Sequence, residues 1–338
     1  METDLDVLVI GGGPVGLFCA HELCRHGISP KRIRIIDKRP EQKLWAKAVG
    51  IQSRTQEIFY ASSKDLSDSI QQQSILQKSA KLYQYPDPKN LINNNDNKIS
   101  LKLSVKINFS ELDSEFNYML SLEQYNTENK IANELNKKYG VKLERGIELI
   151  DFIDKGSYVL VKLDKYKKKK IDDEKDSKSS EEIDNLPQEL RVKYLIGCDG
   201  ARSFVRSKLN LPFIGETYDE KFLLFHGYIN HQNQLEMPST FIVSGINGFL
   251  FVITMSDNSW IIVADLDEKQ QKLYHNGKFE MPTKSDFEKI FNQRGLNGFK
   301  ITDVKWLTKF EVQSRQIAQY SKGIQFIYIL YKMFLFFC

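Results

Sequence analysis

LDVLVIGGGPVG, residues 5–16, decides the fold of this chain. Residues 5–10 form a short apolar run rich in β-branched residues that leads directly into glycines, which is typical of a buried parallel strand. A helix closed by Gly27 is predicted next, with apolar side chains on one face at Val15, Phe18, Cys19 and Leu23. Residues 33–37 (IRIID) predict a second strand. The opening of the chain therefore predicts a βαβ crossover.

The glycines Gly11, Gly13 and Gly16 form a GxGxxG pattern at the start of this helix, with Pro14 and Val15 inside it. Glycine is needed there because a Cβ atom would block the tight turn and keep the backbone away from a pyrophosphate. The free N–H groups and the dipole of the helix N-terminus stabilise that charge. The pattern in this context predicts dinucleotide binding.

Asp37 ends the second strand and is followed by Lys38. A carboxylate at this position can bind the ribose hydroxyls of an adenosine. It would repel a 2′-phosphate, so the predicted ligand is FAD or NAD rather than NADP. The spacing does not choose between FAD and NAD.

The composition is that of a globular protein of two domains, with 338 residues, 41% apolar residues and 27% charged residues. A net charge of +4 is too slight to indicate a nucleic-acid partner. We expect no membrane span, because no apolar segment is long enough, and no secretory or mitochondrial leader, so the predicted location is cytoplasmic.

No metal site is expected. The cysteines are scattered and are predicted to be reduced structural thiols: Cys19, Cys24, Cys198 and Cys338. His21 and His26 are expected to be partly exposed surface residues rather than ligands.

Four strand-like runs separated by Asn, Gly and Ser turns predict a mostly antiparallel sheet. They are FLLFHGYI (222–229), STFIVS (239–244), GFLFVITM (248–255) and SWIIVADL (259–266). Two polar, low-complexity stretches, 87–98 and 165–185, are predicted to be insertions in surface loops.

A second candidate site lies at 194–203 (YLIGCDGARS), where an apolar strand runs into the turn Asp199-Gly200. The acid, with the nearby guanidinium of Arg202, could bind hydroxyls or phosphates of a nucleotide. An ordinary turn in which the aspartate caps the next helix is the competing interpretation.

The segment LIGCDGARSFVR is similar to the second fingerprint of the flavoprotein aromatic hydroxylases, the p-hydroxybenzoate and phenol hydroxylase family of class A flavoprotein monooxygenases. Residues 46–59 (AKAVGIQSRTQEIF), which include Ala48 and Arg54, resemble the family segment that lines the isoalloxazine region. Gln124 matches the glutamine that contacts the ribityl chain at a helix start. Residues 306–323 resemble the approach to the third fingerprint. The motifs stand in family order.

This resemblance implies an α/β fold, in which a Rossmann-like (GR2-type) FAD-binding domain carries an inserted, mostly antiparallel β-sheet substrate domain. It implies FAD as cofactor, NADH or NADPH as co-substrate, and hydroxylation of a small phenolic or aromatic substrate by molecular oxygen through a flavin hydroperoxide. A homodimer is an open option. The implied cofactor-binding residues are Gly11, Gly13, Pro14, Val15, Gly16, Asp37, Lys38, Ala48, Arg54, Gln124, Asp199 and Gly200. No catalytic residue is assigned.

The expected domain boundaries follow from these motifs. Residues 1–82 and 104–212 form the FAD-binding domain, 83–103 and 165–188 the loop insertions, 213–305 the substrate domain, and 306–338 the return to the FAD-binding domain.

Two departures from the family pattern shape the expected function. Ala48-Val49-Gly50 lacks the aspartate with which phenol hydroxylases polarise the substrate hydroxyl, which argues against simple phenol. Residues 331–338 (YKMFLFFC) stand where the family has Gly-Asp-Ala-Ala-His, so the chain is expected to be truncated there. Two hypotheses follow: a working hydroxylase whose flavin site is completed by another residue, or a truncated, inactive FAD-binding protein.

Overall fold

The computed structural model describes residues 2–85, 101–166, 187–231, 239–275 and 280–327. The chain forms two compact units. Of the described residues, unit 1 contains those up to 44, those of 125–215 and those of 315–327, and unit 2 contains those of 45–124 and 216–314. The expected loop residues 86–100 and 167–186 and the tail 331–338 lie outside the described residues.

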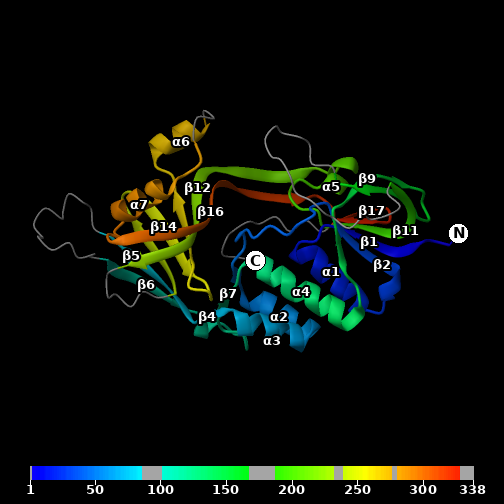
Figure 1. Cartoon of the computed structure of the whole chain (residues 1–338), viewed down its shortest axis with the longest axis horizontal. Helices are drawn as coiled ribbons and strands as arrows, with labels where there is room; N and C mark the ends of the chain where they lie inside the picture. The colour runs from blue at the N-terminus through cyan, green and yellow to red at the C-terminus, as the bar shows by residue number, and fades with distance from the viewer. Residues whose placement is uncertain (1, 86–100, 167–186, 232–238, 276–279, 328–338) are drawn as a thin grey trace, which may run out of the picture. The chain divides into compact units, whose positions relative to one another are not determined.

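Unit 1 is built on an eight-stranded sheet with the order β17-β18-β11-β1-β2-β8, in which β10 also pairs with β11 and β9 pairs with β10. Its elements are β1 (Leu5–Ile10), α1 (Pro14–Arg25), β2 (Ile33–Asp37), α4 (Gln124–Tyr139), β8 (Leu143–Arg145), β9 (Ile147–Asp154), β10 (Val159–Lys165), β11 (Gln188–Gly197), α5 (Phe204–Lys208), β17 (Ser321–Lys322) and β18 (Gln325–Ile327). Figure 1 shows α1 and α4 beside β1 and β2. The predicted βαβ crossover is confirmed.

The centre of this sheet is β1, which pairs in parallel with β2 and β11. Leu8 and Val9 are fully buried because both faces of the strand are covered, which explains the unbroken apolar run in the sequence. β18 pairs in parallel with β11, so the chain returns to this sheet at residues 325–327.

The buried face of α1 differs from the expected one. Its buried side chains include Leu17, Ala20, His21 and Cys24. The expected surface position of His21 is wrong: its ring has no exposed area, stacks on Phe18 and meets the edge of the Tyr139 ring in α4 at 5.3 Å between centroids. The cover supplied by α4 comes from far along the chain, so helical spacing within α1 alone did not reveal it.

Unit 2 holds a seven-stranded sheet with the order β16-β12-β15-β14-β13-β5-β6 and a small sheet β3-β7-β4. Its elements are β3 (Gly50–Ile51), α2 (Ser53–Ser62), α3 (Lys64–Gln73), β4 (Ile75–Gln77), β5 (Ser79–Gln84), β6 (Lys102–Asn108), β7 (Met119–Ser121), β13 (Thr240–Gly245), β14 (Gly248–Thr254), β15 (Trp260–Asp265), α6 (Glu268–His275) and α7 (Lys284–Gln293). The long strands β12 (Phe213–His231) and β16 (Phe299–Ile317) have residues in both units. The four predicted strands are confirmed.

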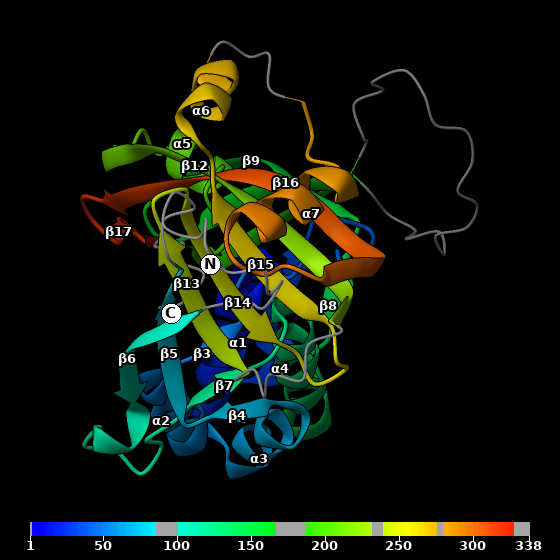
Figure 2. The ribbon, with the colours of Figure 1, turned by 90° about the vertical axis from the view of Figure 1, so that its left-hand side faces the viewer.

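The large sheet has two apolar faces, and each is covered within unit 2. Face A carries Phe225, Phe241 and Ile262, and Phe287 and its neighbours in α7 pack against it. Figure 2 shows α7 lying over the strands of this sheet. Face B is defined by the alternate residues of the same strands: Leu224, Phe251, Ile253, Ile261 and Val263. The segment that contains Ala46 and Val49, together with Met119, packs against face B.

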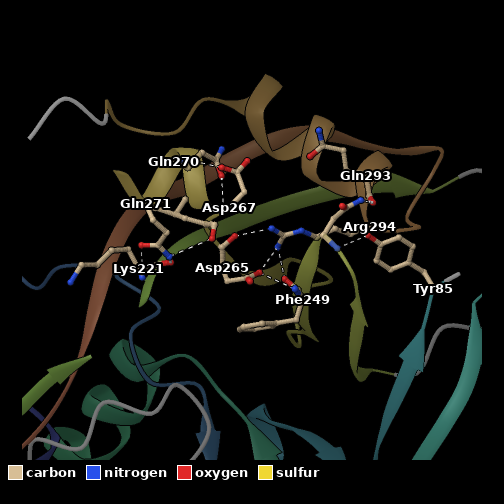
Figure 3. Close-up of polar contacts among 11 residues, drawn as sticks. Tyr85, Lys221, Phe249, Asp265, Asp267, Gln270, Gln271, Gln293 and Arg294 are labelled. Atoms are coloured by element: carbon tan, nitrogen blue, oxygen red, sulfur yellow. Dashed lines mark hydrogen bonds and ion pairs between the residues drawn. The ribbon is translucent and has the colours of Figure 1, made fainter. Parts of the chain in front are cut away.

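One buried cation ties the end of α7 to this sheet. Arg294 is 3% exposed and donates to the Asp265 carboxylate at 2.8 Å and to the Asp265 carbonyl at 2.8 Å. Figure 3 shows the guanidinium pointing between Asp265 and Phe249. The Asp265 carboxylate also accepts the Phe249 backbone N–H at 2.8 Å, so this ion pair sits in a fuller hydrogen-bond network.

The two units do not follow the expected domain boundaries. Residues 45–82 and 104–124, expected in the FAD-binding domain, belong to unit 2. The reason is pairing over a long sequence distance: β5 lies parallel to β13, with Leu82 opposite Ile242, and β6 pairs with β5. The ends of the expected loop 83–103 are therefore strand residues.

Candidate flavin site

The three glycines of the predicted motif have three separate structural roles. Gly11 has φ +110°, and a Cβ there would lie 2.3 Å from the Cys198 carbonyl oxygen, so only glycine permits this turn. At Gly16 a Cβ would lie 1.9 Å from the Gly11 carbonyl oxygen, so α1 can pack against β1 only without it. At Gly13 a Cβ would meet no described atom within 4 Å.

These roles match the requirements of a pyrophosphate cradle. Two glycines allow the chain to turn and pack tightly, while the open space at Gly13 is where a ligand can approach the backbone. Gly13 is the N-cap of α1 and makes no side-chain cap, Pro14 follows it, and the first turn carries no acidic residue. The amides of Val15 and Gly16 therefore stand at the positive end of a helix dipole. The residues present fit the phosphates of FAD.

Asp37 lies at the carboxyl end of β2, beside this turn. Its Oδ2 accepts the Gly12 N–H at 2.9 Å and its Oδ1 accepts the Arg39 N–H at 2.8 Å, while the Arg39 guanidinium binds both oxygens. Burial would raise the pKa of Asp37, but the hydrogen bonds from Arg39 and Gly12 outweigh it and lower that pKa. The carboxylate is therefore charged at neutral pH, and Arg39 is a neighbour that the motif did not predict.

Asp199 has a clear structural task. Its Oδ1 accepts the Ser203 hydroxyl at 2.5 Å, and its Oδ2 accepts the N–H groups of Phe204 at 2.6 Å and Val205 at 3.3 Å. These bonds satisfy free amides at the start of α5. Gly200 has φ +82°, the left-handed conformation that favours glycine. The capping interpretation of this turn is therefore the one visible in the structure, and a nucleotide role remains a prediction.

The remaining predicted residues fall in different places. In unit 1, Lys38 is exposed and its Nζ lies 3.7 Å from Glu148 Oε1. In unit 2, Ala48 is half-buried in the segment that packs on face B. Arg54 lies in α2 with its side chain 82% exposed and paired with Glu57 at 2.8 Å. Gln124 is the first residue of α4, as the resemblance implies.

The structure also places together side chains that the sequence analysis did not connect. The thiols of Cys19 and Cys198 form a hydrogen bond, and this bond and burial raise the pKa of Cys198 well above its usual value. On face B, His226 lies 2.9 Å from the Ser259 hydroxyl. A histidine inside the apolar run FLLFHGYI was the available signal for the second cluster.

Among the described residues, no group of three or more His, Cys, Asp or Glu side chains is arranged to hold a metal ion. Within the same part of the chain, none of the helices combines the length and the apolar character needed to cross a bilayer.

Comparison with known proteins places this geometry in a family. A family model described as an FAD binding domain matches residues 4–328. Pentachlorophenol 4-monooxygenase of Sphingobium chlorophenolicum is 23% identical over 333 residues, which cover 96% of this chain and 53% of that protein. The chain belongs to the FAD-dependent aromatic hydroxylase family.

Other members of this hydroxylase family are also similar to this chain in sequence or in structure. Para-nitrophenol 4-monooxygenase of Pseudomonas sp. WBC-3 is 27% identical over 270 residues, covering 79% of this chain and 55% of that protein. The crystal structure of p-nitrophenol 4-monooxygenase from Pseudomonas putida DLL-E4 superposes with a TM-score of 0.71 at 20% identity, covering 97% of this chain and 72% of that one. A complex of aklavinone-11 hydroxylase with FAD and aklavinone gives a TM-score of 0.69 at 17% identity, covering 97% and 57%. These likenesses confirm the predicted fold class. The chain spans about half the length of most of the curated relatives it matches.

Proposed function

We propose that this chain supplies the FAD-binding and substrate-binding parts of a monooxygenase that hydroxylates a phenolic or other aromatic compound. The observation that carries the proposal is the cradle at the start of α1, where Gly11 and Gly16 are required for packing and Gly13 leaves open space. Membership of the hydroxylase family supports the choice of FAD over NAD for that cradle.

Each part of the chain has a proposed task. The α1 N-terminus, with Pro14 and Val15, holds the pyrophosphate, and Asp37 binds the adenosine ribose. This requires Arg39 to share the carboxylate or to turn away, which its 38% exposed side chain permits. Ala48, Arg54 and Gln124 contact the flavin end of the cofactor. Lys38, Asp199 and Gly200 complete the set assigned to cofactor binding.

When bound, FAD reduced by NADH or NADPH supplies the chemistry that activates molecular oxygen. The protein holds the aromatic ring and excludes water. Face B supports the role of the protein in holding the ring, because the segment that contains Ala46 and Val49 packs directly on its apolar side chains. Val49 has no proton-accepting group, so a substrate hydroxyl must find its partner elsewhere.

The test is to purify the 338-residue chain, add FAD, and record flavin binding by the visible spectrum. Oxidation of NADH and NADPH is then followed with a panel of phenols, and the hydroxylated product is quantified. We expect bound FAD and phenol-dependent formation of hydroxylated product. A chain that binds no FAD contradicts the proposal.

The alternative is an FAD-binding protein without hydroxylase activity. It depends on residues 331–338, which lie outside the described residues. The same assay separates the two: FAD binding with NAD(P)H oxidation that yields only peroxide supports the alternative, and coupled product formation supports the hydroxylase.

A further inference from the structure

The polar cluster on face B of unit 2 consists of His226, Tyr228, Asp257, Ser259 and Lys305. His226 lies on β12 directly opposite Ile261 of β15, and opposite residues of an antiparallel pair point to the same face. Ile261 belongs to face B, the surface on which Ala46 and Val49 pack. The imidazole of His226 therefore lies on the same face of the sheet as the residues against which Ala46 and Val49 pack.

The hydrogen bonds of this cluster fix the tautomer of His226. Ser259 Oγ lies 2.6 Å from Asp257 Oδ1, and because a carboxylate only accepts, the serine hydroxyl donates its one proton to it. The same serine oxygen lies 2.9 Å from His226 Nε2 and must accept there. His226 therefore carries its proton on Nε2, and Nδ1 is a bare lone pair.

The aspartate that imposes this direction is firmly charged. Burial would raise the pKa of Asp257, but hydrogen bonds from Lys305 and Ser259 lower it to about 2. Lys305 Nζ binds Asp257 Oδ2 and also lies over the Tyr228 ring, while the Tyr228 hydroxyl lies 3.4 Å from the same carboxylate oxygen. The Ser259 backbone N–H also donates to Asp257 Oδ1 at 2.9 Å, so this charged carboxylate can only accept the proton of the serine hydroxyl.

The bare nitrogen is the unexplained group. His226 is 1% exposed, and no described residue gives its Nδ1 a hydrogen bond. Buried polar atoms are nearly always paired, so one left open calls for a ligand or a function. Burial and then the charge of Lys305 lower the pKa of His226 to about 4, against a smaller opposing effect of Asp257. The imidazole is consequently neutral at pH 7, and Nδ1 can accept a hydrogen bond.

We propose that His226 Nδ1 accepts a hydrogen bond from the hydroxyl group of the aromatic substrate and so positions its ring on face B. This inference rests on the proposed function and narrows its substrate class to aromatic compounds that carry a neutral hydroxyl. A lone pair repels an anion, so a phenolate or a ring carboxylate is not held at this atom. His226 is too weak a base to remove the proton of a phenol, whose pKa is about 10. Its role is positioning.

The test compares a phenol with its methyl ether, which has the same ring and no proton to donate. The full chain with FAD in excess is titrated with 4-chlorophenol and with 4-chloroanisole at pH 7, and binding is followed by tryptophan fluorescence. We expect the phenol to bind about tenfold more tightly than the ether, as for one buried hydrogen bond. In His226→Leu the preference should fall to about one, and in His226→Asn, whose amide oxygen can replace Nδ1, it should partly return.

The matched control is His231→Leu. His231 lies on the same strand but packs against Trp260 of face A, so this variant should keep the preference. A second measurement needs no variant: in the wild-type chain with 15N-labelled histidine, the phenol should shift the Nδ1 resonance of His226 and the ether should not.

Equal binding of phenol and ether by the wild type, absence of phenol binding, or an unmoved His226 resonance overturns the inference. Its failure is distinguishable from that of the proposed function, because the titration needs no turnover. A chain that hydroxylates phenols without preferring them to ethers keeps the function and loses the role of His226. A chain that prefers the phenol and shows the shifted His226 resonance but forms no product keeps the role of His226 and loses the proposed function.

Discussion

Replacing Gly13 and Gly16 by alanine should separate nucleotide binding from folding at one loop. In Gly16→Ala the new Cβ would lie 1.9 Å from the Gly11 carbonyl oxygen, where ordinary contact begins at 3.4 Å. Gly11 cannot easily retreat, since its N–H donates to Ile36 at 2.8 Å and its own Cβ position is blocked by Cys198. Relief must come from moving α1 against the sheet. Overpacking of this kind costs about 3 kcal/mol.

The Gly13→Ala variant should behave in the opposite way. Gly13 has φ −78° and ψ −180°, which alanine adopts freely, and its Cβ would meet no described atom within 4 Å. We expect a stability change below about 0.5 kcal/mol. Affinity for ADP should fall at least about tenfold, because the methyl group holds the pyrophosphate off the helix N-terminus and at least one charge-assisted hydrogen bond of about 1.5–3 kcal/mol is lost.

The measurements are urea unfolding followed by circular dichroism and calorimetric titration with ADP. The Gly16→Ala midpoint should fall by about 1 M, for a slope of about 3 kcal/mol per M. Each variant serves as the control for the other. Undiminished ADP affinity in Gly13→Ala would refute the assignment of the phosphate site, and an unchanged midpoint in Gly16→Ala would refute the packing argument.

Three further predictions are tested by urea unfolding, the last of them together with equilibrium dialysis. Arg294→Met should destabilise the chain by about 3 kcal/mol, because it leaves the Asp265 carboxylate without its cation. Arg54→Ala, which removes an ion pair on an 82% exposed side chain, should change stability by less than about 0.5 kcal/mol. Equal effects of the two substitutions would contradict this prediction. The pKa of His226 is about 4 in the folded chain and 6.5 unperturbed, so as pH falls His226 is protonated in the unfolded chain before it is protonated in the folded chain. The contribution of neutral His226 to stability is therefore present above pH 6.5 and is lost as pH falls towards 4, by about 3 kcal/mol in total. Urea unfolding of His226→Leu between pH 7 and 4 should lack this loss, and an identical pH slope argues against it. Gln124→Ala should lower FAD retention in equilibrium dialysis without moving the urea midpoint, and unaltered retention removes Gln124 from the flavin site.

The sequence by itself determined the features that depend on neighbours along the chain. Residues 5–37 carry strand, glycine turn, helix and strand in one continuous stretch, so the periodicity and the glycine spacing of the turn were visible without any distant contact. The strands from Phe222 to Asp265 were predictable for the same reason, since alternation and turn residues are local signals.

Only the tertiary structure decided what each of these elements meets. Pairing of β5 with β13 placed an early segment in unit 2, and the packing of α4 on α1 buried His21, because partners far apart in sequence leave no periodic trace. The sequence left Asp199 open between a nucleotide ligand and a helix cap, and its bonds to the start of α5 show the cap. His226 appeared as one polar residue in an apolar strand. Its open nitrogen follows from the turn between β14 and β15, which brings Asp257 and Ser259 against β12 and so fixes the direction of every hydrogen bond in the cluster.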